Sequence, residues 1–141
     1  MSLEDLLLRN ELKREQPTPG EIQRLLEGIE RRLQDAGNEA NHPETRLEQA
    51  YHAILGCAVA ALRARGLRPT DRPGHHIVAV ESLGDTLGIS LERVDYFQTL
   101  RDLRNKSLYT GSTHITVRQS EEAIEEATQL HQDLKTWLDQ L

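Results

Sequence analysis

The chain has 141 residues and a formal net charge of −6, and its length is sufficient for one domain with a sizeable core. No apolar run approaches about 18 residues, which excludes a membrane-spanning helix. The acidic balance argues against general affinity for nucleic acid. The single cysteine, Cys57, cannot form an internal disulfide, and the N-terminus lacks a basic leader, so we expect a cytoplasmic protein without a signal peptide.

The first forty residues predict two helices. A short helix is expected over residues 2–15, and the Gln-Pro-Thr-Pro-Gly sequence at residues 16–20 ends it. Thr18 and Pro19 then begin a second helix, whose apolar stripe runs from Ile22 to about Ala36. We interpret residues 1–40 as an N-terminal helical hairpin that extends the main bundle. A dimerisation arm is the alternative.

Residues 41–141 predict the main bundle, so the expected fold class is all-α, an up-and-down bundle of four or five helices. The longest apolar helix, over residues 44–65, carries small residues on several sides and is the expected central helix. The sequence also predicts a loop over residues 66–74, a shorter helix over residues 75–88 and a last helix from Thr116 to about Gln140. The absence of alternating strands excludes most nucleotide-binding α/β folds.

The penultimate helix is predicted over residues 90–111 with both ends marked, because Ser90 is a good N-cap and Gly111 a good C-terminal stop. Arg104 falls in the middle of its apolar arc, between Leu100 and Leu108. An unpaired buried charge is costly. Arg104 therefore either pairs with a carboxylate on a neighbouring helix or lies at the mouth of a cleft that holds phosphate.

Basic side chains concentrate in the middle of the chain. Residues 63–106 contain eight basic and six acidic residues, so a phosphate-bearing ligand is expected there. The densest basic cluster consists of Arg63, Arg65, Arg68 and Arg72. This cluster is either solvated loop charge or a rim that attracts phosphate.

The neighbouring His75 and His76 invite interpretation as a metal site. Adjacent helical side chains point about 100° apart and cannot both bind one ion well. No further ligand stands at metal-binding spacing beside them. We therefore predict no metal and no cofactor, and we expect the pair to cap the helix or to contribute one histidine to a cleft.

The sequence Arg-Asn-Lys-Ser-Leu-Tyr at residues 104–109 resembles the Arg-Asn-centred motif of HEPN domains. Two earlier stretches, which begin at Tyr51 and Gly74, resemble the preceding helices of small bacterial HEPN proteins, and the resemblance covers residues 47–138. HEPN ribonucleases carry an arginine followed four to six residues later by a histidine. They cleave RNA without metal, usually at a site shared across a homodimer. Here Tyr109 stands where that histidine is expected, and His114 lies beyond the helix end.

The resemblance implies that Arg104, Asn105 and Tyr109 are the catalytic residues if the protein has any activity. The binding residues it implies are Arg101, Lys106, His75, His76 and Tyr51. The missing histidine favours a non-catalytic or regulatory module that binds a partner protein, nucleic acid or nucleotide through an Arg104-centred cleft.

Two alternatives stay open. One is a divergent metal-independent endoribonuclease of the toxin–antitoxin type, in which Tyr109 with His75 or His76 replaces the missing histidine. The other is a purely structural dimerising bundle. The expected partners are a second copy of the chain, RNA or a nucleotide, and a cognate protein such as an antitoxin, with no membrane.

Overall fold

The computed structural model describes residues 2–111 and 114–141. In chain order, the elements are α1 (Leu3–Leu8), β1 (Leu12–Arg14), α2 (Glu21–Gly37), α3 (Pro43–Ala64), β2 (Leu67–Pro69), α4 (His75–Glu81), α5 (Leu83–Thr86), α6 (Leu91–Thr110) and α7 (Val117–Asp139). The all-α bundle predicted from the sequence is confirmed. Within the described residues, no helix combines the length and apolarity needed to cross a bilayer.

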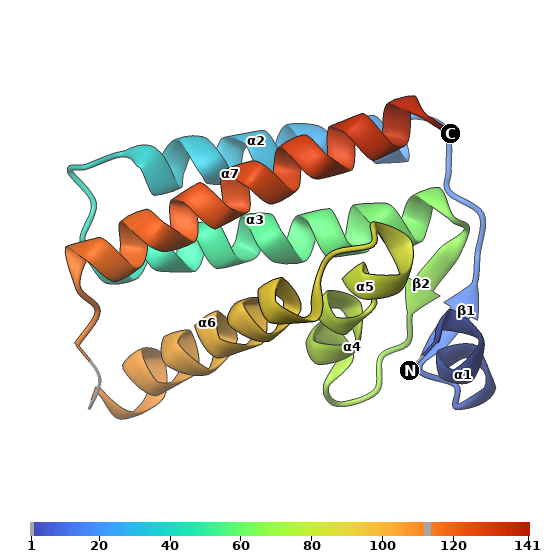
Figure 1. Ribbon diagram of the computed structural model, residues 1–141, viewed down its shortest axis with the longest axis horizontal. Coiled ribbons are helices and arrows are strands. Elements are labelled where there is room, and N and C mark those ends of the chain that lie inside the picture. The colour runs from blue at the N-terminus through green and yellow to red at the C-terminus, as the bar shows by residue number, and fades with distance from the viewer. Residues whose placement is uncertain (1, 112–113) are drawn as a thin grey trace.

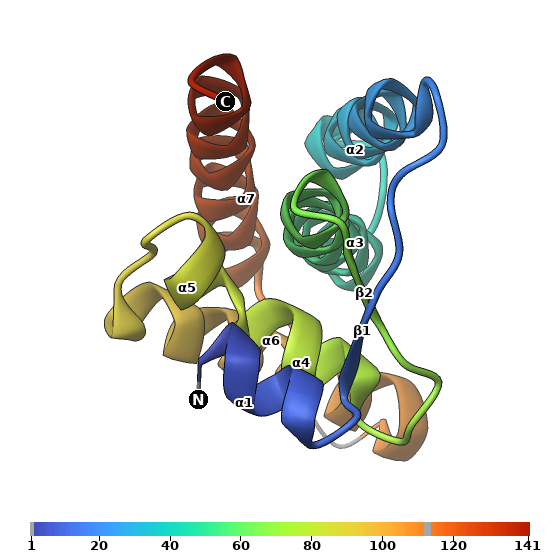
Figure 2. The same ribbon diagram turned by 90° about the vertical axis from the view of Figure 1, so that its right-hand side faces the viewer.

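Helix α3 is the centre of the fold, as its small and apolar residues predicted. Helices α2 and α7 pack along one side of it, and α4, α5 and α6 pack on the other (Figures 1 and 2). Gly56 allows α2 to approach closely, because a Cβ atom there would lie 2.9 Å from Cγ1 of Ile29. The tight contact fixes the relative position of α2 and α3.

The N-terminal segment differs from the expected hairpin of two helices. Helix α1 ends at Leu8, and Asn10 adopts a left-handed φ of 59°. The chain then forms β1, which pairs antiparallel with β2 in the register Leu12↔Pro69. Strand β2 lies within residues 66–74, which the sequence predicts to be a loop. Helix α2 does not pair with α1 but packs along α3. The hairpin prediction is corrected because the buried Leu12 gains a partner strand that lies far away in the sequence.

The ends of the later helices follow local signals. The Ser90 hydroxyl accepts a hydrogen bond from the Arg93 amide, and Gly111 adopts a left-handed φ of 63°, as predicted. Thr116 begins α7 with a capping box. The single helix expected over residues 75–88 is divided at Ser82, whose hydroxyl donates to the Ala79 carbonyl at 2.6 Å. Such local bonds compete with helix continuation.

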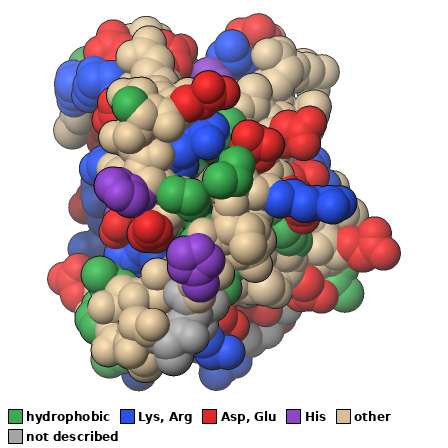
Figure 3. All heavy atoms as spheres, turned by 90° about the vertical axis from the view of Figure 1, so that its left-hand side faces the viewer, with side chains coloured by type: hydrophobic (Ala, Val, Ile, Leu, Met, Phe, Trp, Pro, Cys, Tyr) green, Lys and Arg blue, Asp and Glu red, His purple; other side chains and the backbone are tan. Residues whose placement is uncertain are grey.

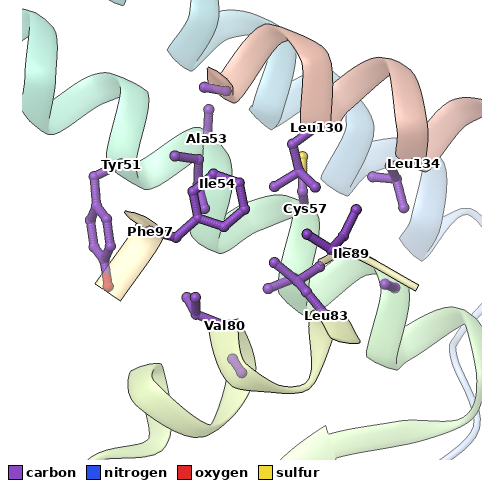
Figure 4. Close-up of a cluster of buried hydrophobic side chains, with 14 of the residues drawn as sticks. Tyr51, Ala53, Ile54, Cys57, Val80, Leu83, Ile89, Phe97, Leu130 and Leu134 are labelled. Atoms are coloured by element: carbon purple, nitrogen blue, oxygen red, sulfur yellow. The ribbon is translucent and has the colours of Figure 1, made fainter. Parts of the chain in front are cut away.

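The core gathers around the middle of α3. Ile54 and Cys57 meet Leu83 of α5, Phe97 of α6 and Leu130 of α7 in one apolar cluster (Figure 4). Burial raises the pKa of the Cys57 thiol to about 12, so it packs as a small apolar side chain. Tyr51 lies at the edge of this cluster (Figure 4).

The basic cluster predicted around residues 63–72 is used within the chain. Arg63 is 1% exposed, and its guanidinium donates to Glu21 on α2, with Nε 2.6 Å from Oε2. It also donates to the backbone carbonyls of Glu15, Gln16 and Leu67. Arg68 pairs with Glu15, Arg65 lies over the Trp137 ring, and Arg72 donates to the Arg9 carbonyl. These contacts exclude Arg63 from a phosphate-attracting rim.

We expect Glu21→Gln to destabilise the protein by about 3 kcal/mol, because it leaves the buried Arg63 charge without its main partner. Urea unfolding of the variant and the wild type measures the difference. Glu27→Gln, on the exposed face of the same helix, is the matched control and is expected to change stability by less than about 0.5 kcal/mol. Equal stabilities for the two variants would show that the Arg63–Glu21 pair does not hold the segment.

The same pair predicts a pH dependence. Hydrogen bonds from Arg63 and from the Thr18 backbone lower the pKa of Glu21 from its ordinary 4.5 to about 2. The ionised carboxylate therefore stabilises the fold fully above about pH 4.5, and this contribution is lost as the pH falls through about 2. Unfolding free energies measured from about pH 6 down to about pH 2 should converge for the wild type and Glu21→Gln. A constant difference across that range would contradict the assigned pKa.

Candidate functional site

Helices α3 and α6 bring Arg104 over Tyr51. The guanidinium carbon of Arg104 lies 5.6 Å from the centre of the Tyr51 ring. Its Nη2 approaches Oε1 of Glu48 on α3 at 3.4 Å, and its Nη1 donates to Oδ1 of Asn105 at 3.2 Å. The carboxylate pairing considered from the sequence is therefore present, but as one long contact on a half-exposed glutamate. Asn105 helps to orient the guanidinium.

Three polar atoms at this seam have no hydrogen-bond partner among the described residues. They are the Tyr51 hydroxyl, Nε of Arg101 and Nε of Arg104. Tyr51 is only 1% exposed, and burial raises its pKa, against the opposing charges of Arg101 and Arg104. The phenol is therefore a neutral donor at pH 7. A buried donor without an acceptor costs about 1 to 3 kcal/mol, so this arrangement suits a ligand that supplies one.

Two histidines lie beside these arginines. Burial and the charges of Arg32 and Arg104 lower the pKa of His52, against the raising effect of Glu48, whose Oε1 is 3.6 Å from His52 Nε2. Burial lowers the pKa of His76 as well, assisted by His75, Arg104, His52 and Arg101. Charges on α2 and α6 thus act on His52 of α3, and charges on α6 act on His76 of α4.

The histidine pair at the start of α4 is arranged edge to face. The ring centres of His75 and His76 lie 4.3 Å apart, and Nδ1 of His75 lies 3.2 Å from the Arg72 carbonyl. In residues 2–111 and 114–141, no three His, Cys, Asp or Glu side chains gather as metal ligands would. Of the pair, His76 is the member near Arg101 and Arg104.

A hollow of about 200 Å³ lies beside Arg104 at the end of the bundle. Its lining includes Glu44, Glu48, Ser107, Leu108 and Ile115. Figure 3 shows this end of the molecule, where exposed hydrophobic side chains lie among acidic, basic and histidine side chains. Two carboxylates face one guanidinium in the hollow, so the hollow itself does not attract anions.

The predicted site residues divide into two sets. Arg104, Asn105 and Tyr51 are in contact at the seam of α3 and α6, and the charges of Arg101 and Arg104 act on the pKa values of Tyr51 and His76. The exposed Lys106 and Tyr109 do not join them: Tyr109 is 77% exposed, and a residue five positions after Arg104 points about 140° away from it on a helix. The apolar arc of α6 is buried only as far as Leu100, and Leu108, predicted to share it, is 55% exposed.

Glu48, His52 and Arg32 belong to the region and were not among the predicted site residues. Glu48 and His52 stand four positions apart, one turn of a helix, on either side of Tyr51. That spacing was a usable signal. Arg32 carried no such signal, because its approach to His52 depends on how α2 packs against α3. His114 is exposed, although its neighbour Ile115 lines the hollow.

No protein-family model and no curated protein sequence matches this chain. The HEPN resemblance therefore stays a prediction.

Proposed function

We propose that this chain is a HEPN-like, non-catalytic binding module that takes a phosphate-bearing ligand, a nucleotide or a nucleic acid, in the cleft where Arg104 meets Tyr51. The supporting observation is the buried Tyr51 hydroxyl without a partner, beside two arginines whose Nε atoms also lack acceptors. Phosphate oxygens accept hydrogen bonds both from phenol hydroxyls and from guanidinium groups. We call Tyr51, Arg101, Arg104 and His76 together the Arg104 cleft.

Charge and desolvation both support phosphate as the ligand. Two guanidinium groups and one neutral phenol can each donate to a phosphate oxygen without losing a proton. Arg104 must exchange its contact with Glu48, which is a single 3.4 Å approach to a carboxylate that is 37% exposed. Such a contact is worth little in water. A phosphate that accepts hydrogen bonds from Arg104 and Tyr51 together gives a larger stabilisation than this single contact.

Weak proton-transfer groups support a non-catalytic role. The motif histidine is absent, and Tyr109 lies exposed away from Arg104. A tyrosine is a poor general base at neutral pH because its pKa is near 10. The proposal includes a cytoplasmic location, for which the buried, unpaired Cys57 is the support.

One observation favours a second candidate, a divergent metal-independent endoribonuclease. His76 lies near Arg101 and Arg104, and its pKa is lowered, so it is neutral and able to accept a proton at pH 7. His76 in place of the missing motif histidine would complete an arginine–histidine pair. The exposed Leu108 and Tyr109 at the end of α6 favour a second copy of the chain, or a cognate protein, as a partner on that surface.

We expect Arg104→Gln to weaken the binding of adenosine monophosphate about tenfold, because one charge-assisted hydrogen bond to phosphate is lost. Tyr51→Phe should also weaken binding, while leaving the melting temperature unchanged or slightly higher, because it removes an unpartnered buried hydroxyl. Isothermal titration calorimetry gives the affinities. Arg118→Gln, an exposed arginine on α7, is the matched control. Equal binding by all four proteins would remove the Arg104 cleft as the phosphate site.

Incubation with labelled RNA separates the two candidates. The binding module predicts intact RNA at high protein concentration, with or without a chelator. Chelator-resistant cleavage that His76→Gln abolishes, and that His75→Gln leaves unchanged, would establish the endoribonuclease instead. Cleavage unaffected by His76→Gln and by Arg104→Gln would indicate a contaminating nuclease.

A further inference from the structure

A second groove lies between α2 and α3, with a volume of about 370 Å³. Its rim carries three arginines of α2, Arg24, Arg31 and Arg32, and the facing side chain of His52 on α3. The floor is apolar and is supplied by Leu25, Ile29, Gly28 and Gly56. The three arginines stand at positions i, i+7 and i+8, so they share one face of the helix.

These arginines keep their charge available. In the parts of the chain that the structure describes, none of the three forms an ion pair. Arg24 donates to the Pro19 carbonyl at 3.4 Å, and Arg32 donates to Oε1 of Gln49 at 3.1 Å. By contrast, Arg63, Arg68, Arg93, Arg101 and Arg104 all approach carboxylates. Asp35 is the carboxylate in the groove lining.

The groove adjoins Arg104 through Glu48, whose Oε1 lies 3.6 Å from Nε2 of His52 and 3.4 Å from Nη2 of Arg104. His52 lines the groove, and its pKa is lowered by Arg32 on one side and by Arg104 on the other. The region as a whole contains five guanidinium groups, those of Arg24, Arg31, Arg32, Arg101 and Arg104. Four carboxylates, of Asp35, Glu44, Glu48 and Asp102, lie among them. The local balance is +1 in a chain whose net charge is −6, so anions are directed to this face.

We propose that the region binds a single-stranded phosphodiester chain, with one phosphate in the Arg104 cleft and further phosphates along the α2 arginines. This inference rests on the proposed function for its first phosphate, and it adds that the ligand is a strand and not a mononucleotide. Arg24 and Arg32 are eight residues apart, about 12 Å along the helix, which exceeds the reach of one phosphate group. The apolar floor between the arginines can accept the faces of sugars and bases.

Fluorescence anisotropy with labelled oligouridines tests the inference, using a dinucleotide and a strand of about twelve nucleotides. The wild type should bind the longer strand at least tenfold more tightly. The double variant Arg24→Gln/Arg31→Gln should lose most of that gain and leave dinucleotide binding unchanged. The slope of log affinity against log salt should fall by roughly 1.4, because each single-strand phosphate contact contributes about 0.7. Arg118→Gln, outside the region, should behave as the wild type.

Several outcomes would overturn the inference. These are equal affinity for the two lengths, an unchanged double variant, an equal loss in Arg118→Gln, and displacement of the strand by polyglutamate at equal charge concentration. No binding of either strand at low salt would overturn this inference and the proposed function together. If Arg104→Gln binds both lengths as the wild type does while the double variant loses the longer strand, the groove stands and the Arg104 cleft fails. A DNA strand of the same length reports whether the 2′-hydroxyl matters.

Discussion

The buried guanidinium of Arg63 holds together segments that are otherwise far apart in the chain. It extends from the end of α3 to Glu21 at the start of α2 and to the carbonyls of Glu15 and Leu67. The acceptors of its hydrogen bonds are thus distributed over the N-terminal segment, the first long helix and the β2 strand. A charge buried at 1% exposure requires such complete pairing. The position of α2 against α3 depends on this contact and on Gly56.

Arg104 provides the contrast that defines the candidate site. Both arginines belong to long helices packed into the bundle, and both meet a glutamate of a neighbouring helix. Arg63 uses every nitrogen on the protein itself, whereas Nε of Arg104 has no acceptor and its contact with Glu48 is long. The two arginines therefore differ in how far the fold satisfies their hydrogen-bond donors. Tyr51, buried and equally unsatisfied, supports the same distinction.

The arrangement around α3 explains how basic side chains can gather on one face of an acidic chain. The exposed acidic side chains of α7, such as Glu121 and Glu125, lie on a different helix from the α2 arginines. Arg32, His52 and Arg104 come from three helices and influence one another only because α2 and α6 both pack on α3. Repulsion from the net charge of −6 is screened within about 10 Å at ordinary salt, so the local balance governs close binding.

The sequence by itself determined the all-α class, the central role of α3, and the caps at Ser90, Gly111 and Thr116. These features depend on side chains within one or two turns of each other, and their signals are local. Only the tertiary structure decided that Leu12 pairs with β2, that Arg63 is buried and paired, and that Leu108 and Tyr109 are exposed. Helical periodicity shows which residues share a face, but the partner that covers that face comes from distant parts of the chain. The environment of each arginine is therefore fixed by packing and not by its neighbours in sequence.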